Sequence, residues 1–116
     1  MTTRRTILVI DDDPAMRDSL AFLLDVNGFS VTTHETAADF LDHFGRSNVD
    51  CVVSDIRMPG MTGLDLVRKL KADAVACPVI LMTGHGDVAL AVEAMKAGAI
   101  DFIEKPFEDE VLLHAI

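Results

Sequence analysis

The 116-residue sequence predicts an α/β domain in which a five-stranded, doubly wound parallel sheet carries helices on both faces. Five short apolar runs, each followed by a helical pattern, give the (βα)5 order. The runs are almost continuously apolar, which is typical of strands buried on both faces. The length suits one domain, and the composition, half hydrophobic and a quarter charged, is that of a soluble globular protein.

The predicted strands are rich in Val or Ile and occupy residues 6–10, 29–33, 51–54, 79–82 and 100–103. The first helix begins at Asp13-Pro14, an N-cap residue followed by proline at the first helical position. A stop is expected at Gly28. Between these signals, apolar residues recur at helical spacing: Met16, Leu20, Leu23 and Leu24.

The second helix is expected from Thr36, with Asp39 in its first turn, to a stop at Gly45. Its inner face would consist of Ala37, Phe40, Leu41 and Phe44. The third helix is expected from about Gly63, with Leu64, Val67 and Leu70 facing inward.

The fourth helix should follow Asp87 and end at Gly98, and the fifth should begin near Glu108. The fifth pattern reaches Ile116 without a cap or a stop. We therefore expect a truncated last helix and a longer parent protein.

The charge balance limits the function of the domain. Ten basic and 19 acidic residues give a net charge of −9, which is unsuited to direct contact with nucleic acid. No apolar run is long enough to span a bilayer, and no secretory signal is present, so a cytoplasmic protein with no membrane partner is expected. Cys51 and Cys77 lie in apolar runs and are interpreted as buried thiols.

Polar groups follow four of the five predicted strands, whereas nothing comparable follows the second. They are Asp11, Asp12 and Asp13, then Asp55, then Thr83, then Glu104-Lys105-Pro106. The carboxyl ends of parallel strands share one edge of a sheet, where ligands bind. Capping a helix requires only one of the three successive carboxylates, so the others remain available for chemistry.

Clustered carboxylates raise one another's pKa values unless a cation neutralises them. Mg²⁺ fits best, since it prefers oxygen ligands and leaves room for phosphate oxygens. Beside such a cation Asp55 could act as a nucleophile towards phosphorus, and Lys105 could pair with the phosphoryl group. Zinc is not expected, because histidine and cysteine are absent from these strand ends. His34, His43 and His114 are interpreted as surface histidines, and no pair of them has metal-ligand spacing.

The segments VIDDD, DIRMPGMTG, MTGHGD and EKPF, at their present separations, resemble response-regulator receiver domains over essentially the whole chain. The stretch from MTGHGD through AVEAMKAGA to DFIEKPFED resembles FixJ-type regulators of nitrogen fixation in particular. This resemblance implies a flavodoxin-like receiver domain over residues 1–116, with strand order 2-1-3-4-5. It also implies a signalling domain of a two-component system rather than an enzyme.

The resemblance assigns Asp55 as the acceptor of a phosphoryl group from a sensor histidine kinase. Asp12 would bind Mg²⁺ directly and Asp11 largely through water, with Asp55 and the backbone carbonyl of Arg57 completing the protein ligands. Mn²⁺ or Ca²⁺ could replace Mg²⁺.

Further roles follow from the same resemblance. Thr83 would be the switch hydroxyl, Phe102 the rotating aromatic residue, and Lys105 the phosphoryl-binding lysine, with a cis Lys105-Pro106 bond. Arg57 and His85 occupy the two positions that tune the lifetime of the phosphoryl group.

Phosphorylation is expected to drive homodimerisation through the fourth helix and fifth strand, since that helix is apolar on more than one face. The expected interface residues are Val88, Val92, Met95, Lys96 and Asp101. Transcriptional control would need a DNA-binding output domain beyond residue 116, of the LuxR-type helix-turn-helix class found in FixJ relatives.

Three alternatives compete with this interpretation. A haloacid-dehalogenase-type phosphatase would require a D-x-D-x-T/V motif after the first strand, where this chain has Asp11-Asp12-Asp13-Pro14. A flavodoxin-like electron carrier would need a Ser/Thr/Gly-rich loop for the FMN phosphate at that position. A receiver-shaped interaction module that is never phosphorylated would normally lack one of the acidic residues or the lysine.

Overall fold

A computed structural model describes residues 4–43, 49–84 and 86–116. Five strands alternate with five helices: β1(Thr6–Ile10), α1(Pro14–Val26), β2(Ser30–His34), α2(Ala37–His43), β3(Cys51–Asp55), α3(Gly63–Ala72), β4(Val79–Thr83), α4(Val88–Ala97), β5(Asp101–Glu104) and α5(Asp109–Ala115). The predicted (βα)5 order is confirmed. The expectations for Phe44, Gly45 and His85 concern positions outside the described residues.

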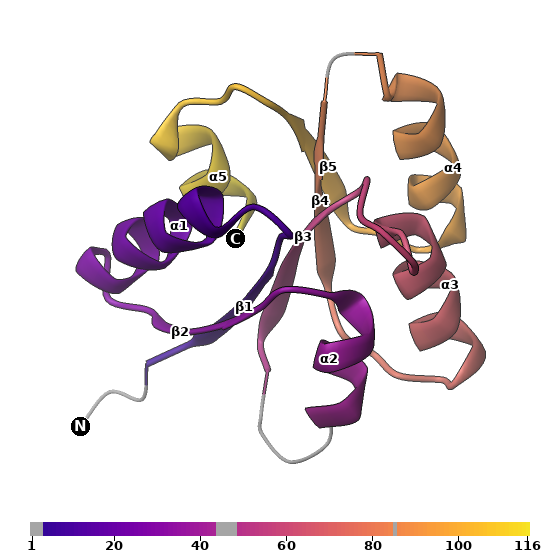
Figure 1. The fold of residues 1–116 in the computed structure, drawn as a ribbon, viewed down its shortest axis with the longest axis horizontal. Coiled ribbons are helices and arrows are strands. Elements are labelled where there is room, and N and C mark those ends of the chain that lie inside the picture. The colour runs from indigo at the N-terminus through magenta and orange to yellow at the C-terminus, as the bar shows by residue number, and fades with distance from the viewer. Residues whose placement is uncertain (1–3, 44–48, 85) are drawn as a thin grey trace.

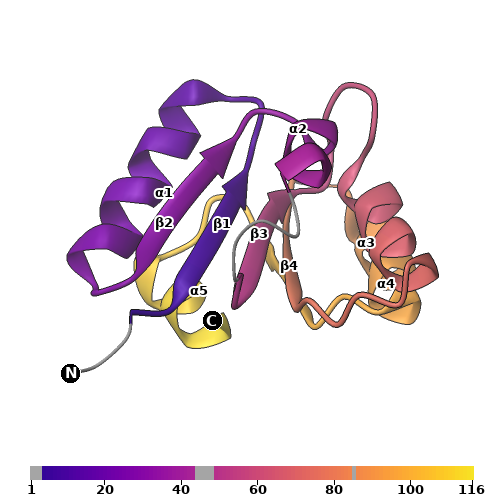
Figure 2. The same ribbon diagram turned by 90° about the horizontal axis from the view of Figure 1, so that it is seen from below.

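The strands form one parallel sheet in the order β2-β1-β3-β4-β5, as expected (Figure 2). Four strands continue one residue beyond their predicted ends, because the added residue still pairs with a neighbouring strand. Thus His34 pairs with Ile10, Asp55 with Met82, and Thr83 with Glu104. The carboxyl ends of all five strands consequently lie along one edge.

Helices cover both faces of the sheet, α1 and α5 on one side and α2, α3 and α4 on the other (Figure 1). The core on the α1/α5 side includes Ile7, Val9, Leu24, Val53, Ile80 and Leu112. The core on the opposite side includes Leu8, Phe40, Val52, Leu66, Leu81 and Ala94. Alternate residues of β1, β3 and β4 thus face opposite layers, which explains why these strands are apolar throughout.

The helix starts have identifiable causes. Asp13 caps α1 by accepting a hydrogen bond from the Ala15 amide at 3.1 Å, and Pro14 is the first helical residue, as predicted. In α3 the side chain of Thr62 accepts from the Asp65 amide, while the Asp65 side chain accepts from the Thr62 amide. This reciprocal capping box stabilises α3 beside the end of β3.

Gly63 allows α3 to begin in contact with the end of β3. A Cβ atom at this position would lie 2.8 Å from the carbonyl oxygen of Asp55 and 2.9 Å from the Cα of Ile56. The Gly63 amide also donates a hydrogen bond to the Ile56 carbonyl at 2.9 Å. The glycine therefore permits a close approach that determines the path of the chain after Asp55.

We predict that Gly63→Ala lowers the free energy of unfolding by about 1–3 kcal/mol, because two backbone groups must move to accept the methyl group. Urea unfolding followed by circular dichroism measures this change. Gly60→Asn is the control, since Gly60 has a φ of 77° that asparagine tolerates and a Cβ atom added there would meet no atom within 4 Å. Equal losses in both variants would contradict the packing argument.

Candidate functional site

The residues that follow β1, β3, β4 and β5 converge at the carboxyl edge of the sheet. Asp11 directly follows β1, and Asp55 is the last residue of the neighbouring strand β3. Thr83 ends β4, and Lys105 follows β5. Because β1 and β3 are neighbours in the sheet, the acidic residues at their carboxyl ends lie together. The strand order reverses at this point, since β2 lies on one side of β1 and β3 on the other.

Lys105 contacts both acidic strand ends. Its Nζ atom lies 3.2 Å from Oδ2 of Asp11 and 3.4 Å from Oδ2 of Asp55. Asp11 is fully buried, whereas the Lys105 side chain is 26% exposed. The ammonium therefore compensates a buried negative charge and still reaches solvent on one side, where an incoming anion could meet it.

Three carboxylates can share a cation at this edge. One oxygen from each of Asp11, Asp12 and Asp55 lies within 4.8 Å of the others, and Asp12 is exposed. Oxygen-only donors of this kind suit Mg²⁺ rather than a softer metal. The residues present thus fit the expected magnesium site.

The pKa of the Asp55 carboxyl is raised, first because the group is partly buried and then because Asp11 is a second negative charge nearby. Lys105 and the Arg57 amide, which lies 3.4 Å from Oδ1 of Asp55, oppose this rise. Lys105 and the Arg57 amide therefore do not bring the pKa of Asp55 back to its ordinary value, and a divalent ion would favour the ionised carboxylate.

Thr83 and Phe102 lie on adjacent strands. The buried Thr83 hydroxyl donates to the Ile103 carbonyl at 3.3 Å, and the Thr83 carbonyl accepts from the Lys105 amide at 2.7 Å. Phe102 is partly buried against the core on the α3/α4 side. The Lys105-Pro106 bond is cis, which confirms that expectation.

The side chain of Arg57 makes a contact that the sequence did not indicate. Its Nε atom lies 2.5 Å from Oδ1 of Asp87, whose side chain is only 7% exposed. Asp87 precedes α4 but makes no side-chain capping bond to that helix. Sequence reasoning gave Asp87 only the start of α4, since a pairing across 30 residues leaves no local signal.

The outer face of α4 carries a small apolar patch. Val88, Val92 and Met95 are 50%, 43% and 38% exposed. Lys96 is also exposed, and Asp101 at the start of β5 is partly buried. The inner face of α4 consists of Ala91 and Ala94, which are buried, with Leu90 and Ala97 partly buried against the same core.

The expectation that the histidines lack metal-ligand spacing was wrong for His34 and His43. His34 ends β2 with a 9% exposed side chain, so it is not a surface residue, and its Nδ1 lies 2.6 Å from Oδ2 of Asp39. His43, one helical turn after Asp39, places its Nδ1 2.8 Å from the Asp39 carbonyl. β2 ends one residue later than predicted, at His34, and α2 folds back over its end, which brings the three side chains together. His43 and His114 are exposed, as expected.

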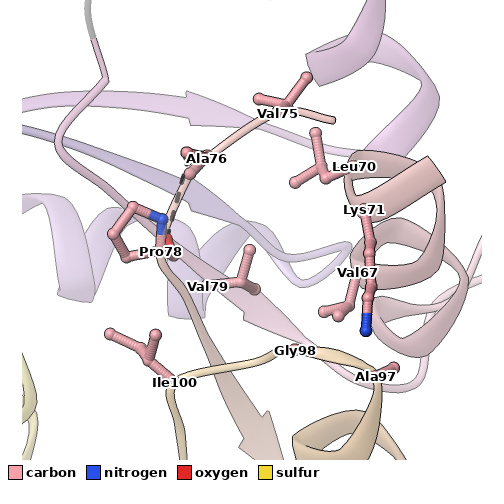
Figure 3. Close-up of a pocket in the computed structure, with 11 residues that line it drawn as sticks. Val67, Leu70, Lys71, Val75, Ala76, Pro78, Val79, Ala97, Gly98 and Ile100 are labelled. Carbon is pink, nitrogen blue, oxygen red and sulfur yellow. Dashed lines mark hydrogen bonds between the residues drawn. The ribbon is translucent and has the colours of Figure 1, made fainter. Parts of the chain in front are cut away.

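An apolar pocket of about 410 Å³ lies at the opposite edge of the sheet, where β4 and β5 begin (Figure 3). Its lining includes Val67 and Leu70 of α3, Cys77 and Val79 before and in β4, and Ile100 before β5. Burial raises the pKa of the Cys77 thiol. The pocket is thus separate from the acidic edge. Both cysteines are free thiols; Cys51 is buried, as predicted, whereas Cys77 is only partly buried.

Within the described residues, no helix has the length and apolar character needed to cross a membrane. A family profile for the response regulator receiver domain matches residues 7–116.

Among curated proteins, the chain is 59% identical over 112 residues to the transcriptional regulatory protein FixJ of Bradyrhizobium diazoefficiens, covering 97% of this chain and 55% of that protein. It is 50% identical over 114 residues to FixJ of Rhizobium meliloti, covering 98% of this chain and 56% of that protein. The chain therefore spans about half the length of these relatives.

Among solved structures, full-length FixJ from B. japonicum superimposes with a TM-score of 0.94 at 57% identity, over 99% of this chain and 57% of that one. The FixJ-N crystal structure gives a TM-score of 0.92 at 48% identity, over 98% of this chain and 91% of that one. Sequence and fold agree. The chain belongs to the response regulator receiver domain family and is similar to FixJ over nearly its whole length.

Proposed function

We propose that this domain accepts a phosphoryl group from a sensor histidine kinase on Asp55, with Mg²⁺ as cofactor. The observation that carries the proposal is the position of Lys105 between Asp11 and Asp55, with Asp12 beside them. One edge thus combines a nucleophilic carboxylate, carboxylates able to bind a cation, and an ammonium able to bind a phosphoryl oxygen.

Asp12, Asp55 and the Arg57 carbonyl would hold Mg²⁺, with Asp11 acting largely through water, and Mn²⁺ or Ca²⁺ could substitute. When bound, the cation would neutralise part of the negative charge on the carboxylates and the phosphoryl oxygens. The raised pKa of Asp55 is consistent with a role for the cation, since burial and Asp11 both disfavour the ionised carboxylate.

In the transfer step, a carboxylate oxygen of Asp55 attacks phosphorus in line. The bond between phosphorus and the kinase histidine nitrogen breaks as the new oxygen–phosphorus bond forms, and its electron pair returns to the imidazole. Lys105 lies 3.4 Å from Oδ2 of Asp55 and would hold a phosphoryl oxygen while retaining Asp11. The domain acts on its own side chain, so it is a signalling domain and not an enzyme with an external product.

The new group adds about −1.5 to −2 charge and three acceptor oxygens beside Thr83. The Thr83 hydroxyl would exchange the Ile103 carbonyl for a phosphoryl oxygen, and Phe102 would turn into the vacated space. Arg57 and His85 would tune the lifetime of the phosphoryl group. Arg57 already spans from the end of β3 to Asp87, so its side chain connects the phosphoacceptor loop with α4.

The output proposed for this change is homodimerisation through α4 and β5. Val88, Val92 and Met95 would form the apolar centre, with Lys96 and Asp101 at its margin. In the whole protein, which we propose is cytoplasmic and free of membrane contact, the dimer would control a DNA-binding output domain beyond residue 116. The net charge of −9 supports DNA contact by another segment.

Two of the alternatives are less well supported by the geometry. The candidate nucleophile follows β3 rather than β1, which is the reverse of the haloacid-dehalogenase arrangement. An interaction module that is never phosphorylated has no need for Asp11, Asp12, Asp55 and Lys105 together at one edge, yet all four are present.

We predict that Asp55→Asn abolishes phosphorylation, because an amide is a far poorer nucleophile and cation ligand. Incubation with acetyl phosphate and Mg²⁺, followed by intact mass measurement, should show one added phosphoryl group on the parent chain alone. Asp73→Asn, which removes an exposed carboxylate paired with Lys69, should leave uptake unchanged. Uptake by Asp55→Asn at the parent rate would disprove the assignment.

We predict that saturating Mg²⁺ stabilises the parent domain by about 1–3 kcal/mol through preferential binding to the folded state. Thermal unfolding with and without Mg²⁺ measures the effect, which should vanish in the double variant Asp12→Asn/Asp55→Asn. The charge-matched variant Asp73→Asn/Asp109→Asn should keep it. A Mg²⁺ shift that persists without Asp12 and Asp55 would locate the cation elsewhere.

We predict that a beryllium fluoride phosphoryl mimic converts the parent chain from monomer to dimer, and that Val92→Asp prevents this by placing a charge in the apolar patch. Sedimentation velocity measures both states. Val26→Asp is the control, because Val26 is 60% exposed at the end of α1, on the opposite face of the sheet from α4. Equal dimerisation of Val92→Asp and Val26→Asp would exclude this face as the interface.

A further inference from the structure

A second group of metal-ligating side chains lies at the end of β2, apart from the acidic edge already described. One ligand atom from each of His34, Asp39 and His43 lies within 4.8 Å of the other two. We propose that these residues form a binding site for a divalent transition metal, with Zn²⁺ as the metal that fits best.

The donor set argues for the kind of metal. Two imidazoles and one carboxylate are the nitrogen and oxygen ligands that Zn²⁺ accepts, whereas Mg²⁺ and Ca²⁺ select oxygen. Three protein ligands also leave a fourth position for water. The two clusters of this domain thus differ in chemistry, and each would select a different cation.

The local structure holds the donors close together before any metal binds. His34 is almost buried at the end of a strand, and its ring packs edge-on against Phe40 with 6.0 Å between centroids. Asp39 and His43 lie one turn apart on α2, the i, i+4 spacing that puts two side chains on one helix face. A rigid strand residue therefore faces two helix residues that project towards it.

Hydrogen bonds already hold the candidate ligands beside one another. Nδ1 of His43 lies 2.8 Å from the backbone carbonyl of Asp39, so with its proton on Nδ1 the ring presents an unprotonated Nε2. Metal-binding histidines commonly donate their second nitrogen to a carbonyl in this manner. The Asp39 carboxylate already lies 2.6 Å from Nδ1 of His34.

Metal binding requires modest movement. The side chains of Asp39 and His43 are 50% and 60% exposed, so they can rotate to shorten the separations to ligand distances. Where the metal takes the nitrogen of His34 that now faces Asp39, the proton on that nitrogen moves to the other ring nitrogen or to solvent. The His34 carbonyl accepts from the Asp11 amide at 3.2 Å, so the two sites would occupy neighbouring strand ends.

Competition against a chromogenic zinc chelator, in a large excess of Mg²⁺ that occupies the acidic edge, tests the proposal. The parent domain should bind one Zn²⁺, and His43→Gln and Asp39→Asn should each weaken binding by at least about tenfold. His114→Gln is the matched control, because His114 is also exposed on a helix but lies outside the cluster. Circular dichroism should show that all three variants are folded.

The ring signals of His34 and His43 in ¹H–¹⁵N NMR spectra should shift on Zn²⁺ addition, while those of His114 stay unchanged. Absence of zinc binding, or equal affinity in His43→Gln and His114→Gln, would overturn the proposal. Zinc binding that Asp12→Asn/Asp55→Asn removes but His43→Gln retains would assign the ion to the acidic edge instead. None of these outcomes bears on phosphoryl uptake by Asp55, which is measured separately.

Discussion

The charge pairing of Lys105 with Asp11 and Asp55 is the interaction on which the proposed chemistry depends. Two carboxylates at adjacent strand ends repel one another, and one of them is fully buried. A single ammonium reduces this cost without cancelling it, which is why the pKa of Asp55 stays raised by burial and by Asp11. The edge is therefore arranged to accept further positive charge and then a phosphoryl group.

Contacts around the acidic edge connect it to the neighbouring helices and to β5. Gly63 brings α3 against the backbone of Asp55, and Arg57 joins the following loop to Asp87 at the start of α4. Thr83 is hydrogen-bonded to β5, beside Phe102. Asp55 is thus connected to α3, α4 and β5 through these contacts, and in the proposed switch the apolar face of α4 responds.

The domain contains two groups of possible metal ligands with opposite preferences. The side chains of Asp11, Asp12 and Asp55 offer only oxygen ligands, while His34 and His43 add nitrogen beside Asp39. The pKa of Asp39 is lowered, chiefly by its hydrogen bond with His34. The backbone bond between Asp11 and His34 places the two groups at the ends of paired strands.

The sequence by itself determined the features that depend on neighbouring residues. The doubly covered sheet follows from the apolar runs, the start of α1 from Asp13-Pro14, and the acidic edge from the rule that parallel strands end together. Contacts across long separations were decided only by the tertiary structure. Lys105 meets Asp11 across 94 residues and Arg57 meets Asp87 across 30, and no local pattern encodes such distances. The grouping of His34 with Asp39 and His43 was missed for a related reason: the end of β2, one residue later than predicted, and the placement of α2 over it are set by packing, not by propensity.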